Sequence, residues 1–204
     1  RVAVVDWDVH HGNGTQQAFY NDSDVLTVSI HQEMLYPVNL GKLEEIGDAA
    51  GEGFNINVPL PAGCGGDAYL KAIDDVVIPA LNAFQPDLII IACGFDAAYF
   101  DPLSHMLLVA NHYRTMTEKM MHAADTLCGG KIIANHEGGY SDFYVPLCGM
   151  AVIETLSGIT SGVKDPYAGT EFVANQDLKP HQFEAIKAAV DGPLAALLAR
   201  QGSS

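Results

Sequence analysis

The sequence has few charged residues, and basic residues are especially scarce. Only 17% of its 204 residues are Asp, Glu, Lys or Arg, whereas 49% are hydrophobic. This composition excludes an intrinsically disordered chain, a collagen-like repeat and a charged coiled coil. Acidic residues outnumber basic ones 25 to 10, which gives a formal net charge of -15. Because such a surface repels phosphate groups and attracts cations, we expect cationic substrates and no direct nucleic-acid partner.

Cysteine pairs and long hydrophobic runs are also lacking. The four cysteines form no C-x-x-C pair, which indicates reduced, partly buried thiols in a cytosolic protein. No run approaches the roughly 18 apolar residues of a membrane helix, so we expect no membrane partner. The first residues lack a signal-peptide pattern and a Met, and the chain opens inside an expected strand at Val2. We therefore expect that residues are missing upstream of Arg1.

Short apolar runs alternate with helical patterns, which is typical of an α/β protein with a parallel sheet. The run Leu88–Ala92 is apolar on both faces, as expected for a strand with helices on either side. We therefore predict a single domain over residues 1–204, with a parallel sheet flanked by helices on both faces. The expected strands are Val2–Val5, Val25–Ile30, Phe54–Val58, Leu88–Ala92 and Lys131–Ala134.

Helices are expected between and after these strands. Asp67 is a candidate N-cap for a helix that Pro79 should kink. A second apolar stripe, from Met106 to Leu127, predicts another core helix rather than a cofactor site. The tail, residues 180–200, predicts one or two helices interrupted by Gly192-Pro193. The long connection, residues 31–53, is of a length that is usually functional or disordered.

The motif D-W-D-V-H-H-G-N-G-T follows the first expected strand. In an extended backbone Asp6, Asp8 and His10 would point to one side and His11 to the other. Two carboxylates and an imidazole at the carboxyl end of a strand suit a divalent metal. Alternatively, these residues would only cap and close a turn, although three such groups crowd unfavourably without a cation.

Two further strand ends carry polar motifs. Asp96, in Gly94-Phe95-Asp96, would supply the third protein ligand of a catalytic zinc site, or would instead cap a helix. Because the set is oxygen-rich, Fe²⁺ or Mn²⁺ remains an alternative to Zn²⁺. The third strand end has H-E-G-G-Y, whose glycines allow a close approach of the backbone to a substrate. Tyr140 would then point to the cleft, where its hydroxyl could donate to an oxyanion, although most such tyrosines only pack.

Taken together, D-W-D-V-H-H-G-N-G-T, A-C-G-F-D-A-A-Y-F-D-P-L and N-H-E-G-G-Y resemble, in order and spacing, the zinc-dependent histone deacetylase superfamily. The likeness covers residues 1 to 160 and looks closest to the class II branch and its bacterial relatives, including amidohydrolases that act on acetylated polyamines. The resemblance implies the arginase–deacetylase fold, a metal at the carboxyl ends of the strands and a cytoplasmic protein.

The resemblance also implies a role for individual residues. Asp8, His10 and Asp96 correspond to the zinc ligands, and Tyr140 to the hydroxyl that stabilises the oxyanion. Asp6 corresponds to a residue that orients a catalytic histidine and binds a structural K⁺ or Na⁺. The residues matching that first monovalent cation site are Asp6, Asp8, His10, Ser29 and Ile30, and those matching a second are Phe19, Asp22, Val25 and Phe54. The residues matching the acyl-lysine channel are Tyr36, Leu103, Gly138 and Gly139.

Two departures from the family pattern qualify these expectations. The family's general base is a His-His pair in an upstream motif, which this chain lacks, and His10-His11 does not replace it. One polyamine-selective branch has Glu where this chain has Leu103, which weakens a strict polyamine preference.

We therefore predict a zinc-dependent amidohydrolase, acting on an acetylated lysine peptide or on an acetylated polyamine or related small amine. The alternative is a non-catalytic metal-binding fragment or pseudoenzyme that binds acylated ligands. A homo-oligomer is left open. A binuclear ureohydrolase would show D-x-H-x-D in place of D-x-D-x-H.

Overall fold

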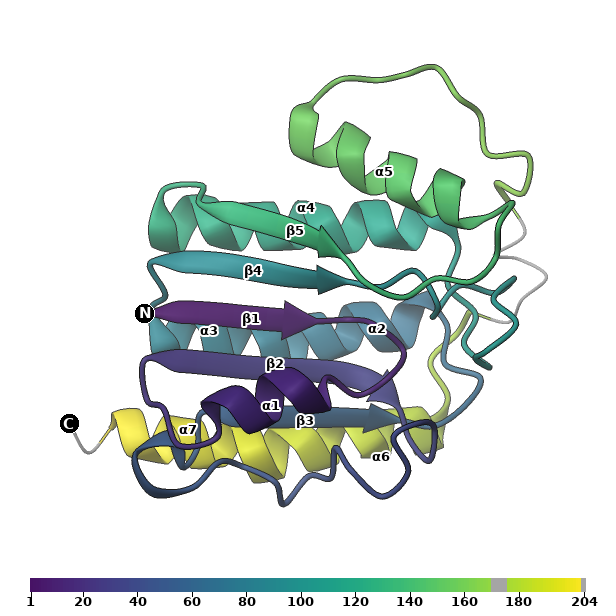
Figure 1. Ribbon diagram of the computed structural model, residues 1–204. Helices are drawn as coiled ribbons and strands as arrows, with labels where there is room; N and C mark the ends of the chain where they lie inside the picture. Colours follow the sequence, from purple (N-terminus) through teal and green to yellow (C-terminus); the bar gives the residue numbers. More distant parts are fainter. Residues whose placement is uncertain (170–175, 203–204) are drawn as a thin grey trace.

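A computed structural model of the protein describes residues 1–169 and 176–202. Its centre is a five-stranded parallel sheet with the strand order β3-β2-β1-β4-β5 (Figure 1). Each strand lies within two residues of the range expected from the sequence. The strands are β1 (Val2–Asp6), β2 (Val25–Gln32), β3 (Asn55–Leu60), β4 (Leu88–Cys93) and β5 (Ile132–His136).

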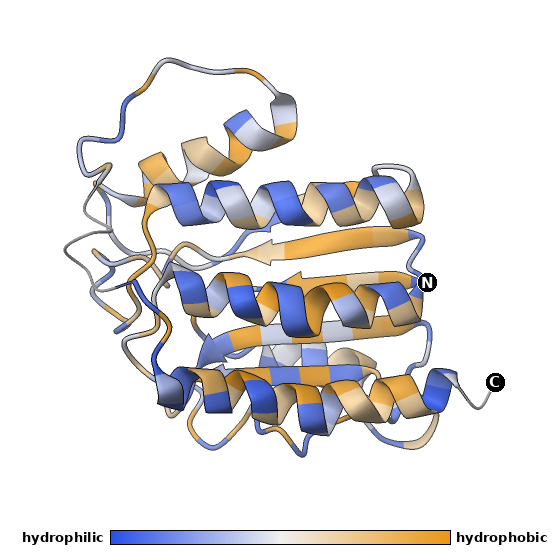
Figure 2. Cartoon of the chain, turned by 180° about the vertical axis from the view of Figure 1, so that it is seen from behind, coloured by the Kyte–Doolittle hydropathy of each residue, from blue (hydrophilic) through white to orange (hydrophobic). Residues whose placement is uncertain are grey.

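The helices are distributed unevenly over the two faces of this sheet. Three rows of helices, α2–α3, α4 and α6–α7, lie side by side over one face (Figure 2), whereas α1 lies on the opposite face beside β2 (Figure 1). Helix α5 packs against α4 next to the β5 edge. The helices are α1 (Asn13–Phe19), α2 (Gly66–Ala72), α3 (Ile78–Phe84), α4 (Ala110–Cys128), α5 (Val145–Ser157), α6 (Pro180–Ala189) and α7 (Ala195–Gln201), with a 3₁₀ turn at Ala49–Gly51.

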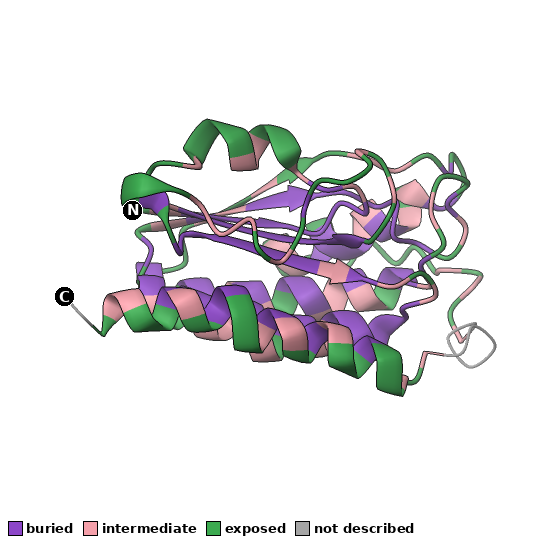
Figure 3. Ribbon diagram, turned by 90° about the horizontal axis from the view of Figure 1, so that it is seen from below, coloured by how far each residue is buried: buried purple, intermediate pink, exposed green. Residues whose placement is uncertain are grey.

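The hydrophobic core lies between the sheet and the three rows of helices (Figure 3). Ile89 and Ile91 of β4 point to this side and are 0% and 1% exposed. The Met-rich stripe contributes Tyr113, Met116 and Met120, all fully buried, so these side chains belong to the core as expected. Burying such side chains is the main favourable contribution to folding.

Several details of the helices differ from the expectations. Asp67 lies inside the first turn of α2, and Gly65 is the N-cap, so the prediction that Asp67 caps this helix is wrong. Pro79 lies at the start of α3, directly after a π-helical segment (Ile73–Val77) that separates α3 from α2. Since proline cannot donate an amide hydrogen bond, a break in the regular helix occurs at this position. The tail is likewise divided by a π-helical segment, Val190–Leu194, which contains Pro193.

The strand order places a change of direction between β1 and β4. The chain passes from β1 outward to β2 and β3, and then returns across the sheet to β4 and β5 on the other side of β1. In open α/β sheets, ligands bind outside the carboxyl ends of the strands at such a switch point. The segments that follow β1 and β4 are therefore where a functional site is expected. None of the helices in residues 1–169 and 176–202 is long and apolar enough to cross a membrane.

Candidate metal centre

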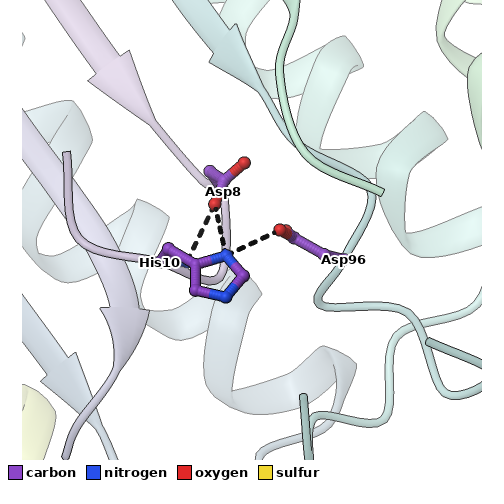
Figure 4. A group of neighbouring side chains, drawn as sticks. All are labelled: Asp8, His10 and Asp96. Carbon is purple, nitrogen blue, oxygen red and sulfur yellow. Dashed lines mark hydrogen bonds and ion pairs between the residues drawn. The ribbon is translucent and has the colours of Figure 1, made fainter. Parts of the chain in front are cut away.

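Asp8, His10 and Asp96 meet at the switch point between β1 and β4. His10 Nδ1 lies 3.1 Å from Asp8 Oδ1 and 2.9 Å from Asp96 Oδ2 (Figure 4). One ligand atom from each of the three residues lies within 4.8 Å of the other two. The Asp96 side chain is fully buried, whereas those of Asp8 and His10 are partly exposed. The three candidate ligands are therefore shielded from solvent on the side of Asp96 and accessible to solvent on the side of Asp8 and His10.

Main-chain hydrogen bonds hold each carboxylate in this orientation. Asp8 Oδ1 accepts from the N–H of His10 at 2.8 Å, and Asp96 Oδ1 accepts from the N–H of Val9 at 2.8 Å. The second oxygen of Asp96 is left facing His10. Asp6 also fixes the backbone at Asp8, because its Oδ1 accepts a hydrogen bond from the N–H of Asp8 at 2.9 Å.

Two glycines allow the backbone to pack directly on the carboxylates. A Cβ at Gly138 would lie 2.2 Å from Asp96 Oδ2 and 2.5 Å from Asp8 Oδ2, and a Cβ at Gly94 would lie 2.6 Å from Asp8 Cα. The N–H of Gly138 instead donates to Asp8 Oδ2 at 2.7 Å. Any side chain at these two positions would displace a candidate ligand.

The ionisation of the three groups is strongly linked. Hydrogen bonds to Asp8 and Asp96 raise the pKa of His10 to about 10. Burial raises the pKa of Asp96 despite its hydrogen bond to His10. For Asp8, burial is again the largest single effect and acts in the same direction, but the hydrogen bonds with His10, Gly138 and Asp96 together outweigh it and lower the pKa. A proton on His10 Nδ1 thus occupies the position between two carboxylate oxygens that a metal cation would take.

The donor set fits a divalent metal. Zinc–nitrogen and zinc–oxygen bonds of about 2.0–2.2 Å place tetrahedral ligands roughly 3.3 Å apart, close to the observed 2.9 and 3.1 Å. Three protein ligands with one open side match a catalytic site rather than a closed structural one. Asp8, His10 and Asp96 would hold the ion. The oxygen-rich set is also compatible with Fe²⁺ or Mn²⁺.

A cavity of about 830 Å³ opens on these ligands. Its floor includes Asp6, Asp8 and His10, and its mouth is mainly apolar. The residues that form the mouth are Leu35, Tyr36, Pro37, Leu103 and Tyr140. Such a combination of an apolar wall and a few polar groups is typical of small-molecule sites.

Tyr140 stands at the edge of the cavity, about half exposed, with its ring edge-on to that of His10 at a centroid distance of 6.2 Å. Burial, together with the charges of Asp96, Asp8 and Asp101, raises the pKa of Tyr140. Its hydroxyl therefore stays protonated at neutral pH and can donate a hydrogen bond into the cavity.

The other residues expected at the substrate channel lie at or next to the cavity. Gly138 lines the cavity with Tyr36 and Leu103. Gly139, the next residue, has a φ of 136°, and a Cβ there would lie 2.9 Å from Val145 Cγ2 and 3.1 Å from Phe95 Cβ. His11 is buried, and its ring faces β2, where its centroid lies 4.7 Å from that of His31 and its Nδ1 lies 3.5 Å from Ser29 Oγ. The residue also lines part of the cavity.

The residues expected at the monovalent cation sites lie near α1 and β2. Asp6 and Ser29 are paired neighbours on β1 and β2, and Ile30 follows Ser29. At the opposite end of β2, Phe19 and Asp22 are joined by a main-chain hydrogen bond of 3.0 Å. Val25 begins β2, and Phe54 precedes β3, where its carbonyl accepts from the N–H of Thr27 at 2.9 Å.

Sequence reasoning missed two contacts that shape the cavity. Asp101 accepts hydrogen bonds from the N–H groups of Leu103 and Tyr140, and His31 binds the carbonyl of Gly41. The first contact had a partial signal, because Asp-Pro favours a turn in which the carboxylate accepts from the amide two residues later. The contact between His31 and Gly41 had no signal in the sequence, since it depends on the path of a long loop.

Comparisons with known proteins give consistent matches. A family model described as "Histone deacetylase domain" matches residues 1–156. A histone deacetylase-like amidohydrolase of Pseudomonas aeruginosa is 52% identical over 166 residues, which are 81% of this chain and 44% of that protein. A probable deacetylase of Archaeoglobus fulgidus is 40% identical over 168 residues, or 81% of this chain and 46% of that protein.

Solved structures show the same likeness. The crystal structure of the HDA15 HD domain superposes with a TM-score of 0.82 at 34% sequence identity, covering 100% of this chain and 53% of that chain. The structure of the histone deacetylase Clr3 superposes with a TM-score of 0.79 at 37% sequence identity, covering 93% of this chain and 30% of that chain. This chain thus spans a little under half the length of the two prokaryotic relatives.

Proposed function

This chain belongs to the histone deacetylase family, and from that premise we propose that it forms the metal-binding part of an amidohydrolase that removes acetyl groups from acetylated lysine or a related acetylated amine. The observation that carries the proposal is the meeting of Asp8 and His10, which line a cavity whose edge holds Tyr140, with the buried Asp96 directly behind them. These residues come from three strand ends that are far apart in the sequence.

The proposed reaction is hydrolysis of an amide, in which water adds to the acetyl carbonyl, the C–N bond breaks, and a proton from the water passes to the leaving amine as acetate is released. The histidine base that would carry this proton belongs to the upstream motif that this chain lacks. A bound divalent metal, preferentially zinc, would polarise the acetyl carbonyl and lower the pKa of a water molecule. Tyr140 would donate its hydroxyl proton in a hydrogen bond to the carbonyl oxygen as negative charge develops there. Because its pKa is raised, Tyr140 would remain a donor throughout the neutral range.

The substrate class follows from the cavity wall and the charge of the chain. Leu35, Tyr36 and Leu103 form an apolar wall that suits the hydrocarbon stem of a lysine or similar amine. The net charge of -15 would attract a cationic peptide or amine. Leu103 offers no carboxylate for a distal ammonium group, which favours acetyl-lysine peptides over polyamines.

A structural K⁺ or Na⁺ is a second part of the proposal. Asp6 and Ser29 are adjacent in the sheet and line a small cavity of about 10 Å³ between β1, β2 and α1, together with His11 and Thr27. Carboxylate and hydroxyl oxygens suit a hard cation. We propose that this ion would support the segment carrying Asp8 and His10.

The test is release of acetate from an acetyl-lysine peptide by this chain, with added zinc and with a chelator. Release that the chelator abolishes and zinc restores would support the proposed activity. A chain that binds no zinc would contradict the proposed metal-binding role, and a chain that binds one zinc ion per molecule yet releases no acetate would contradict catalysis by this chain alone. Acetylated spermidine in parallel reactions distinguishes the two substrate classes.

A further inference from the structure

The Asp101 carboxylate joins two parts of the cavity wall that are distant in sequence. Asp101 Oδ2 accepts from the N–H of Tyr140 at 2.7 Å, and Asp101 Oδ1 accepts from the N–H of Leu103 at 2.9 Å. Asp101 is only 7% exposed, and its own N–H donates to the carbonyl of Ala98 at 2.9 Å. Each carboxylate oxygen of Asp101 thus accepts a hydrogen bond from a different segment of the cavity wall.

Both of these partners line the cavity above the metal ligands. Leu103 is 49% exposed and Tyr140 is 51% exposed, so neither side chain is held in place by burial. Hydrogen bonds to an ionised acceptor are shorter and stronger than neutral ones. The two bonds to Asp101 therefore fix the backbone from which these exposed side chains project.

The loop that carries Tyr140 needs this support. It follows β5 through Gly138 and Gly139, and Gly139 has a φ of 136°. Gly138 is held on both sides, because its N–H donates to Asp8 and its carbonyl accepts from Phe95 at 2.8 Å. The bond from the N–H of Tyr140 to Asp101 is the next anchor along the loop, and it directly precedes the side chain that faces the cavity.

We propose that Asp101 is a positioning residue that sets the distance between the Tyr140 hydroxyl and the metal ligands and ties Tyr140 to the Leu103 wall. This inference rests on the proposed deacetylase function for its catalytic consequence. Asp101 itself would not touch the substrate.

The Asp101→Asn variant tests this role with little change in shape. An Asn side chain has one acceptor oxygen and one NH₂ group, so it can satisfy only one of the two N–H groups. Asp142→Asn is the matched control, since Asp142 is exposed and lies two residues after Tyr140. The two variants make the same charge change on neighbouring segments.

Two measurements are needed, one of which does not depend on activity. The first is the position of the amide signals of Leu103 and Tyr140 in ¹⁵N-correlated NMR spectra. We expect at least one of them to shift strongly in Asp101→Asn and neither in Asp142→Asn. Unchanged amide signals in Asp101→Asn would overturn the inference.

The second measurement is the separation of kcat from KM with the acetyl-lysine peptide. We expect kcat of Asp101→Asn to fall about 10- to 100-fold, the range for a misplaced catalytic group, at unchanged zinc content. In a Tyr140→Phe background the same substitution should have less than about a threefold further effect, because coupled residues are not additive. Full additivity, or equal kcat in Asp101→Asn and Asp142→Asn, would refute a role through Tyr140. If the unchanged chain releases no acetate, the proposed function fails for this chain, and the amide signals alone decide the role of Asp101.

Discussion

His31 and Gly41 connect the sheet to the loop that forms one side of the cavity mouth. His31 Nε2 donates to the carbonyl of Gly41 at 3.0 Å, and His31 Nδ1 accepts from the Ser29 hydroxyl at 2.9 Å. Burial lowers the pKa of His31 to about 3, so the ring is neutral and its one proton lies on the nitrogen that faces the carbonyl. The loop before Gly41 carries Tyr36 and Pro37, which line the mouth.

A first prediction concerns Gly41→Ala. Gly41 has a φ of +75°, and a Cβ there would lie 2.5 Å from His31 Nε2 and 2.7 Å from His11 Cγ. Gly63 has a similar φ of +85° but nothing within 4 Å of its Cβ position, so Gly63→Ala is a control for backbone strain alone. Strain of this kind costs about 1–2 kcal/mol, and overpacking adds roughly 1–3 kcal/mol. Urea unfolding should show a larger loss of unfolding free energy for Gly41→Ala than for Gly63→Ala. Trypsin should also cleave after Lys42 faster in Gly41→Ala. Equal losses of unfolding free energy in the two variants would mean that the loop makes room for the new Cβ and that overpacking against His31 and His11 adds no cost.

Much of the sheet and of the metal centre could be predicted from the sequence, because local patterns determine them. The run Leu88–Ala92 is apolar on both faces, and the structure covers one of its faces with helices and buries Ile89 and Ile91. Asp8, His10 and Asp96 follow strands that proved to be neighbours. The carboxyl ends of parallel strands meet at one edge of a sheet, so the polar motifs had to converge there.

The contacts of Asp101 and His31 could not be predicted, because they depend on the path of loops. Asp101 and Tyr140 are 39 residues apart, and no periodic pattern relates them.

A second prediction is that Asp96→Asn weakens zinc binding. The substitution keeps the shape of a fully buried side chain and its acceptor toward the N–H of Val9, but removes the negative charge next to His10. We expect the dissociation constant for zinc, measured by calorimetry, to rise at least about 100-fold, beyond the 10- to 100-fold typical of residues that only support ligands. Asp142→Asn, on the exposed side of the Tyr140 loop, should bind zinc as the unchanged chain does. Undiminished affinity in Asp96→Asn would remove this residue from the ligand set.

A third prediction is that Tyr140→Phe separates metal binding from turnover. The ring would still fit beside His10, while the hydroxyl that donates into the cavity would be lost. Removal of one such donor costs about 10²–10³-fold in kcat, so acetate release should fall by this factor at unchanged zinc content. Phe143→Tyr, which adds a hydroxyl at an exposed aromatic residue nearby, should not restore activity to the Tyr140→Phe chain. Full activity of Tyr140→Phe would require another donor for the carbonyl oxygen.

The last prediction concerns the pH dependence of stability in the metal-free chain. Hydrogen bonds to Asp8 and Asp96 raise the pKa of His10 to about 10 in the folded state, whereas an unfolded histidine has a pKa of about 6.5. The folded chain therefore binds more protons between these values, and its free energy of unfolding should decrease as the pH rises from about 6.5 to about 10. The stabilising contribution is fully present below about pH 6.5 and is lost above about pH 10.

Urea unfolding in the presence of a chelator, at intervals from pH 6.5 to pH 9.5, measures this decrease. His10→Gln is the control, because glutamine cannot be protonated, and the same series should be flatter for that variant. Zinc must replace the proton on His10 Nδ1, so zinc affinity should rise with pH over the same range while the stability of the metal-free chain falls. These opposite slopes follow from one proton held between two carboxylates. Parallel pH profiles for the unchanged chain and His10→Gln would show that this proton is not bound in the folded state.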